Sequence, residues 1–356
     1  MIHIRSFDIE FYQQNLRAFL PERIIDIHTH VWLDKYRKTT HASEARLATW
    51  PSRVAKDNSI EDLKETYDLL FPDKKVSALM FSMAESGDDL DILNNYVTQS
   101  SQKSGFQALI FASPNWDTDE FKNKILEGGF IGAKVYLSLA PTYIPGNEIR
   151  IFDFAPIHQL KVLNDLGGIL MLHIPRPNRL KDTVNLAQLL EIEEKYPNIK
   201  LIIAHVGRAY CNEDIGNAFD ILSKTKNMLF DISANSNEYV FHRLIETVGP
   251  KRILFGSDLP ILQMRARRVT ENNAYINIVP KGLYGDVSGD KNMREASDAE
   301  ADKITFFLYE EIAAFKRAAL AAKLTPAEIE DIFYTNANSI ISSAKLSIDG
   351  RRPYHR

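Results

Sequence analysis

Short apolar runs rich in β-branched residues recur along this chain, and polar segments with helical spacing separate them. Eight such runs occur, at residues 23–30, 75–84, 106–114, 130–138, 167–175, 199–207, 226–234 and 251–258. Most are nearly continuous rather than alternating, which is typical of parallel strands that are covered on both faces. The pattern therefore predicts eight parallel strands.

The segments between these runs predict helices, because apolar positions recur in them at helical spacing. The clearest examples are residues 59–71, 88–101, 155–167, 184–196 and 237–249. Each connection exceeds the dozen or so residues that a parallel crossover needs. No linker rich in Pro, Gly or Ser divides the array. We therefore predict one domain, residues 1–356, with an α/β fold: a distorted (β/α)₈ TIM barrel whose core spans about 23–341.

Two connections are much longer than a helix requires. One follows the first predicted strand, from Val31 to about Asp73, and the other follows the eighth, from Leu259 to about Glu310. Both leave the C-terminal ends of strands, where barrel enzymes build their sites. We expect two long insertions that can cover a site, with oligomer contacts or surface decoration as the alternative.

Composition narrows the class of partner. The 356 residues are 45% hydrophobic with a formal net charge of −4, so the chain can bury a large core but has no basic footprint for nucleic acid or an anionic membrane. We expect a small-molecule partner. The single cysteine, Cys211, excludes an internal disulfide and a cysteine-type zinc site. With no apolar leader and no long apolar span, we expect a soluble, cytoplasmic protein.

Ionisable residues stand near the ends of the predicted strands. They are His28 and His30 on the first strand, Lys134 on the fourth, His173 on the fifth, His205 on the sixth and Asp258 on the eighth. A lone histidine in an apolar run is ordinarily a satisfied core residue, and Asp258 could cap a turn. Parallel strand ends, however, gather around one mouth, and imidazole and carboxylate groups suit zinc and related ions. Together these residues predict a metal or catalytic centre.

The run "IIDIHTH" adds a local argument. Side chains alternate along a strand, so Asp26, His28 and His30 are predicted to share one face, with the two imidazoles converging. Asp26 could then orient one of the histidines, or could serve only as a buried hydrogen-bonding group.

These residues carry a resemblance to a known family. The segments "IIDIHTH", "MLHIP", "IIAHVG", "ILFGSDLP" and "IFYTNANSII" resemble the amidohydrolase superfamily of metal-dependent hydrolases. More narrowly, they are similar to the amidohydrolase-related branch, which includes aminocarboxymuconate semialdehyde decarboxylase, γ-resorcylate decarboxylase and pyrone dicarboxylate lactonase. The resemblance runs from about Arg23 to about Ile341. Its motifs are specific for the superfamily and unspecific for the substrate.

The resemblance implies roles for five residues. It implies that His28, His30, His173 and Asp258 ligate one divalent ion, zinc first and manganese as the alternative. It further implies that His205 acts as a base or hydrogen-bonding partner for the ion's water, and that Asp258 receives the proton of that water. An ion of this kind can lower the pKa of bound water and polarise a carbonyl group.

Five cationic residues are candidates for substrate binding. In binuclear members of the superfamily a lysine like Lys134 is carbamylated and bridges two metals, whereas the motifs here favour one metal and an unmodified lysine that binds a carboxylate or oxyanion. Arg53 in the first insertion and Arg265 in the second could clamp a substrate carboxylate, as could Arg267 and Arg268. For any one of these arginines, the alternative is an ordinary solvated side chain.

The favoured function is metal-dependent hydrolysis of a C–O or C–N bond in a small, anionic substrate. The alternative on the same scaffold is a non-oxidative decarboxylase, in which Asp258 protonates carbon. A third hypothesis is a non-catalytic barrel that binds a metabolite through its long insertions. Family analogy also suggests a homodimer.

Overall fold

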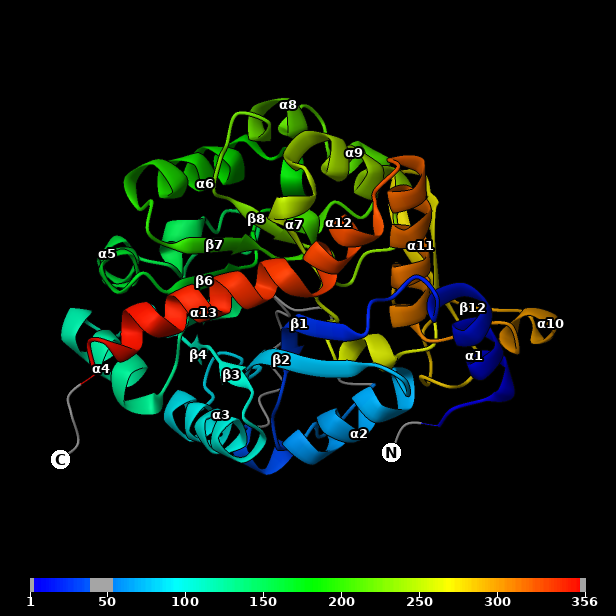
Figure 1. Ribbon diagram of the computed structural model, residues 1–356, viewed down its shortest axis with the longest axis horizontal. Helices are drawn as coiled ribbons and strands as arrows, with labels where there is room; N and C mark the ends of the chain where they lie inside the picture. Colours follow the sequence, from blue (N-terminus) through cyan, green and yellow to red (C-terminus); the bar gives the residue numbers. More distant parts are fainter. Residues whose placement is uncertain (1–2, 39–53, 353–356) are drawn as a thin grey trace.

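All eight predicted strands are present in the computed structural model, which describes residues 3–38 and 54–352, and most are shorter than predicted (Figure 1). The third predicted strand is broken into two pieces, β3 and β4. From β5 onward the label number is therefore one higher than the strand's position in the barrel. The strands are β1 (Arg23–His30), β2 (Lys75–Phe81), β3 (Gln107–Ala108), β4 (Ile110–Phe111), β5 (Gly132–Val135), β6 (Ile169–Leu172), β7 (Lys200–Ile203), β8 (Leu229–Asp231) and β9 (Ile253–Leu254).

These strands pair in parallel and in chain order around the barrel. One sheet has the order β1-β2-β3 and the other has the order β4-β5-β6-β7-β8-β9. Backbone hydrogen bonds join the last strand to the first: the Ile27 amide donates to the Phe255 carbonyl at 3.0 Å, and the His30 amide donates to the Leu259 carbonyl at 2.8 Å. The fold is the predicted α/β TIM barrel. Its core is almost entirely apolar, as expected for strands covered on both faces.

Helices follow the strands and form the outer layer (Figure 1). They are α2 (Ile60–Leu70), α3 (Leu90–Ser104), α4 (Thr118–Gly128), α5 (Ile157–Leu166), α6 (Thr183–Lys195), α8 (Ala218–Leu222), α9 (Glu238–Val248) and α11 (Phe307–Ala321). Local sequence sets several boundaries. Ser59 caps α2 by accepting a hydrogen bond from the Asp62 amide, and Gly105 ends α3 at φ +77°, a conformation that glycine adopts without strain. No helix among the described residues is both long enough and apolar enough to span a membrane.

The C-terminal segment closes the end of the barrel opposite the strands' C-terminal ends. Helix α12 (Pro326–Glu330) leads through a π-helical turn into α13 (Asn336–Asp349), which crosses the barrel in Figure 1. The Asn336 amide group donates to the Ile253 carbonyl at 2.9 Å, and the Ser347 hydroxyl donates to the Leu166 carbonyl at 2.7 Å. Both acceptors lie where β9 and β6 begin, so this helix covers the face away from the candidate site.

The second long insertion contains a small sheet that the sequence analysis treated only as a loop. Its strands are β10 (Arg267–Glu271), β11 (Ala274–Val279) and β12 (Met293–Glu295). β10 and β11 form a hairpin whose two turn residues, Asn272 and Asn273, have φ values of +50° and +62°. Asparagine tolerates this left-handed conformation, which the favoured two-residue hairpin turn requires. The stretch "RVTENNAYINIV" therefore carried a hairpin signal that the analysis did not use.

Candidate metal centre

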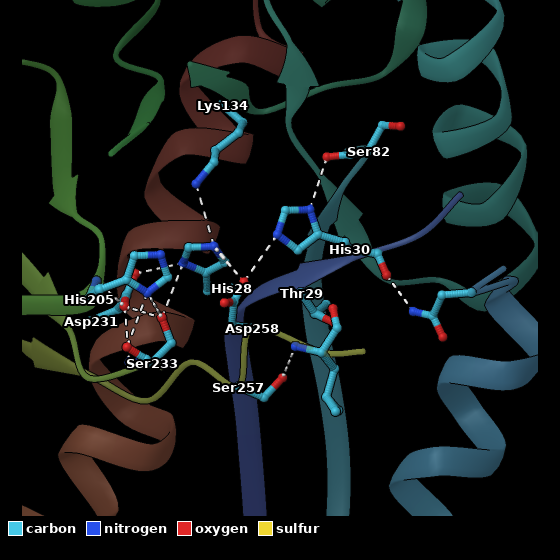
Figure 2. A network of polar contacts seen from close by, with 12 residues as sticks. His28, Thr29, His30, Ser82, Lys134, His205, Asp231, Ser233, Ser257 and Asp258 are labelled. Carbon is cyan, nitrogen blue, oxygen red and sulfur yellow. Dashed lines mark hydrogen bonds and ion pairs between the residues drawn. The ribbon is translucent and has the colours of Figure 1, made fainter. Parts of the chain in front are cut away.

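Most of the predicted strand-end residues meet at the C-terminal mouth of the barrel, where Figure 2 shows His28, His30, Lys134, His205 and Asp258. His28 and His30 lie in the last three residues of β1, while His205 comes two residues after β7 and Asp258 four residues after β9. The Nε2 atoms of His30 and His28 lie 3.2 and 3.5 Å from Oδ1 of Asp258. Candidate ligand atoms of His28, His205 and Asp258 all lie within 4.8 Å of one another, and the three residues are buried. Residues from distant parts of the chain thus converge on one point.

The opposite ring nitrogen of three histidines is already engaged by the protein. Nδ1 of His28 lies 2.9 Å from a carboxylate oxygen of Asp231. Nδ1 of His30 lies 3.1 Å from the Ser82 carbonyl oxygen, and Nδ1 of His205 lies 3.1 Å from the Ser233 carbonyl oxygen. With Nδ1–H as the donor, Nε2 is left as a free acceptor on the mouth side. This is the arrangement that orients metal-ligating histidines in proteins.

His173 completes the histidine cluster. Its ring centroid is 5.3 Å from that of His205, and its buried Nδ1 has no hydrogen-bond partner in residues 3–38 and 54–352. A buried, unpartnered imidazole nitrogen is costly unless a ligand satisfies it. The group whose candidate ligand atoms all lie within 4.8 Å of one another nevertheless contains His205 and not His173. His205, which was expected to act on the ion's water, therefore lies as close to His28 and Asp258 as a ligand would.

The charges at this mouth suit a divalent cation. Burial lowers the pKa of His28, His173 and His205 below the usual histidine value, which favours neutral imidazoles. With Nδ1–H as the donor, the Nε2 acceptors of His28 and His30 face the Oδ1 acceptor of Asp258, and a cation between them satisfies all three. Neutral imidazoles beside a carboxylate are the donor set of zinc and related ions, so these residues fit a metal.

Lys134 points into the same centre. Its Nζ lies 3.4 Å from Nε2 of His28 and 4.9 Å from the centroid of the Phe81 ring (Figure 2). The side chain is buried and forms no ion pair with a carboxylate in the described part of the chain. Burial lowers its pKa to about 8. The charges of Asp231 and Asp258 oppose this lowering, and an ammonium without a direct ion pair can bind an anionic group that enters the mouth.

The sequence analysis missed Asp231, which links two of the histidines. One carboxylate oxygen bonds Nδ1 of His28 at 2.9 Å, and the other accepts the backbone amide of His205 at 2.9 Å. Asp231 ends β8, so it carries the same strand-end signal that identified Asp258. The Ser233 hydroxyl donates to this carboxylate and extends the network.

Asp26 does not share the face of the two histidines, contrary to the alternation predicted for an ideal strand. A β-bulge lies in β1 between Asp26 and Thr29 and changes the direction of the side chains. The Asp26 carboxylate accepts hydrogen bonds from the Tyr67 hydroxyl of α2 at 2.6 Å and from the His28 backbone amide at 3.1 Å. It therefore supports the backbone of β1 and does not contact a histidine ring.

Backbone strain is concentrated at the same mouth. His205 and Asp258 have φ values of +57° and +53°, in the left-handed region that side-chain-bearing residues rarely adopt. Such conformations cost about 1–3 kcal/mol each and persist where surrounding contacts enforce them. Here the amide of His205 is held by Asp231, and the amide of Asp258 donates to the His28 carbonyl at 2.7 Å.

Two of the four arginines considered for substrate binding, Arg265 and Arg53, have different outcomes. Arg265 does not reach the centre: its guanidinium donates to both carboxylate oxygens of Asp8, at 2.8 and 2.6 Å, and to the His3 carbonyl at 2.7 Å. These contacts tie the second insertion to the N-terminal helix α1 (Ser6–Phe11), so we do not retain Arg265 as a substrate-binding residue. Arg53 lies outside the described residues.

A buried acid near this network gives a pH prediction. Glu311 on α11 is fully buried, and burial together with the Asp231 charge raises its pKa well above normal. The folded protein therefore retains a proton that the unfolded chain loses above about pH 4.3, so stability falls as pH rises beyond that value. Glu311→Gln removes this loss of stability at higher pH, because glutamine does not ionise.

We therefore expect the free energy of unfolding of Glu311→Gln, measured in urea relative to the unmodified protein, to increase from pH 5 to pH 8. Glu65→Gln, on an exposed position of α2, serves as the control. A stability difference for Glu311→Gln that does not change with pH would contradict the prediction.

Comparison with known proteins identifies the class. The family model described as Amidohydrolase matches residues 25–340. The chain therefore belongs to the amidohydrolase family, whose members are enzymes. No curated protein matches the chain.

Solved structures share the fold at low sequence identity. A probable 2-pyrone-4,6-dicarboxylic acid hydrolase from Acinetobacter baumannii, with citric acid bound, is 15% identical, with a TM-score of 0.55 and coverage of 90% of this chain and 99% of that one. An amidohydrolase from Burkholderia multivorans with bound zinc is 12% identical, with a TM-score of 0.53 and the same coverages. The manganese complex of 5-carboxyvanillate decarboxylase from Novosphingobium aromaticivorans is 13% identical, with a TM-score of 0.52 and coverage of 92% and 97%.

Proposed function

We propose that this protein is a metal-dependent hydrolase that cleaves a C–O or C–N bond in a small anionic substrate. The observation that carries the proposal is the convergence of neutral imidazoles on the Asp258 carboxylate, with the outer nitrogen of three histidines engaged by the protein. We assign His28, His30, His173 and Asp258 as ligands of one divalent ion. Zinc is the first choice and manganese the second, and similar structures contain one or the other.

A divalent ion in this position would polarise a substrate carbonyl and lower the pKa of a water molecule. The chain's own residues supply the remaining functions. The Asp258 carboxylate accepts the proton of the attacking water and delivers it to the leaving group. His205 hydrogen-bonds at the same point through the ring nitrogen that does not face Ser233. The Lys134 ammonium neutralises an anionic group of the substrate.

Decarboxylation is the second candidate on the same residues. Lys134 is a buried cation without a carboxylate partner among the described residues, so it could hold the carboxylate that leaves. Asp258 would then donate a proton to carbon, so its protonated form takes part in this reaction as it does in hydrolysis. We place hydrolysis first because the matching family model is described as Amidohydrolase, although a decarboxylase is among the similar structures.

Metal content of the purified protein is the first test. We expect about one divalent ion per chain by elemental analysis, and loss of that ion in the double variant His28→Ala/His30→Ala. Lactones, amides and aromatic carboxylates are then incubated in ¹⁸O-labelled water. Incorporation of label into a product supports hydrolysis, whereas carbon dioxide release without incorporation supports the decarboxylase. A metal-free protein with no activity on any of them would reject both.

A further inference from the structure

A group of arginines and tyrosines lies beside the metal centre and has no assigned role. Arg179, Arg208, Tyr210, Arg268 and Tyr275, here named the arginine–tyrosine cluster, come from segments that follow β6, β7 and β9. The Tyr210 and Tyr275 ring centroids are 5.1 Å apart. The Arg268 guanidinium lies 4.9 and 4.5 Å from these two centroids, and that of Arg179 lies 5.2 and 5.3 Å from them. Two cations therefore lie against the same pair of rings.

The charges in this cluster do not balance. Arg179 pairs with Asp214 at 2.6 Å, but Arg208 and Arg268 form no ion pair with a carboxylate in residues 3–38 and 54–352. Arg268 donates only to neutral oxygens, those of Asn277 at 2.8 Å and of the Ala234 carbonyl at 2.6 Å. Arg208 likewise donates from Nη1 to the Ile174 and Pro175 carbonyls. Three guanidinium groups share one carboxylate, which leaves a local excess of positive charge.

This excess lies in a partly buried environment, where it is costly. Burial lowers the pKa of Arg268 and raises the pKa of Tyr210 to about 12, while the charges of Arg208 and Arg268 oppose that rise. Arginine nevertheless stays protonated in proteins, so the cations persist. A pair of half-buried cations without a carboxylate partner favours an anionic ligand, and the planar guanidinium matches a carboxylate in particular.

Tyr136 connects the cluster to the metal centre. Its ring lies 4.6 Å from that of His173, and its hydroxyl interacts electrostatically with Arg208, Tyr210 and Asp258. The hydroxyl groups of Tyr136, Tyr210 and Tyr275 form no hydrogen bond within the described parts of the chain, so all three can donate to a ligand. Arg208 donates to the carbonyl of Ile174, the residue after His173, so an anion at Arg208 would lie beside the metal centre.

We propose that Arg208 and Arg268 form a second binding subsite, which holds a carboxylate of the substrate remote from the bond that reacts. This inference rests on the proposed function for the position of the reacting end. It specifies a substrate with two anionic ends or with one remote carboxylate. Arg268 takes the substrate-binding role that was expected of Arg265 in the same insertion, because Asp8 occupies the donors of Arg265.

The neighbouring residue Arg267 provides a matched control. It lies on the same strand, β10, where consecutive side chains point to opposite faces. Its guanidinium is exposed and pairs with Glu300 at 3.2 Å. Arg267→Gln therefore removes the same charge from the same strand without touching the cluster.

The test measures how much a second carboxylate adds to binding. Succinate, glutarate, adipate and isophthalate are titrated calorimetrically into the metal-loaded full-length protein, with butyrate and benzoate as monocarboxylate references. We expect at least one dicarboxylate to bind about tenfold or more tightly than its reference, because charge-assisted hydrogen bonds are gained. Arg208→Gln and Arg268→Gln should each remove most of that gain, and Arg267→Gln should retain it. Thermal unfolding of each variant confirms that it is folded.

Two results would overturn the proposal: no gain for any dicarboxylate with the unmodified protein, or a gain that survives both Arg208→Gln and Arg268→Gln. If phenyl phosphate shows the gain over phenol and the carboxylates do not, the assignment to a carboxylate is wrong. The assay needs no turnover. If the purified protein contains no metal but binds a dicarboxylate more tightly than its reference, the proposed function is wrong and the subsite stands. If the protein is a metal-containing hydrolase without this gain in binding, only the subsite is wrong.

Discussion

Asp258→Asn is expected to lower kcat/KM by about 10²- to 10⁴-fold, the range typical of losing a positioned proton-transfer group. The amide has nearly the same size as the carboxylate but cannot accept the proton of the attacking water. It also removes the negative charge that lies 3.2 Å from His30 and 3.5 Å from His28. Steady-state kinetics on the substrate found by the labelling experiment, with metal content measured in parallel, checks this expectation.

Asp231→Asn is the matched comparison for this variant. Asp231 contacts Nδ1 of His28 from behind, so its loss should weaken metal binding by about 10–100-fold while leaving turnover of the fully loaded enzyme closer to normal. If metal-loaded Asp258→Asn kept full activity, Asp258 could not be the proton acceptor.

Asp8→Ala is expected to lower the free energy of unfolding by about 3–5 kcal/mol, because it leaves the buried guanidinium of Arg265 without its counter-ion. Both partners are buried, and Thr305 adds a 2.9 Å hydrogen bond to the same carboxylate. Urea unfolding of the purified variant measures the effect. Arg294→Ala, which breaks the exposed pair with Glu271, should leave the unfolding free energy nearly unchanged.

The same variant distinguishes the two roles considered for Arg265. If this arginine bound substrate, Asp8→Ala would alter KM with little effect on stability. The contacts predict the opposite: a large loss of stability, with KM unchanged under conditions in which the variant is folded.

The barrel could be predicted because each apolar run is a local feature of the chain. Strands such as β6 and β7 are buried on both faces and therefore read as continuous hydrophobic stretches. Capping signals such as Ser59 and Asp182 likewise depend on residues three or fewer positions away. The β10–β11 hairpin could have been predicted in the same way, because its Asn272–Asn273 turn is also a local feature of the sequence.

The candidate site was predictable in part, for a related reason. Parallel strands bring their C-terminal ends together, so a histidine or aspartate at such an end must lie near the mouth. That rule located His28, His30, His173, His205 and Asp258, and it would also have located Asp231. It could not foresee the bulge in β1 that turns Asp26 toward Tyr67, because a bulge depends on how two strands pair.

The sequence by itself determined the barrel, its insertions and the set of strand-end donors, since these follow from short-range hydrophobic pattern and parallel topology. Only the tertiary structure decided which arginine of the second insertion is paired with a buried carboxylate. Arg265 and Arg268 lie three residues apart and look alike in the sequence, yet one is paired with Asp8 and the other has no carboxylate partner in the described chain. The difference is set by a carboxylate 257 positions away, which no local pattern encodes.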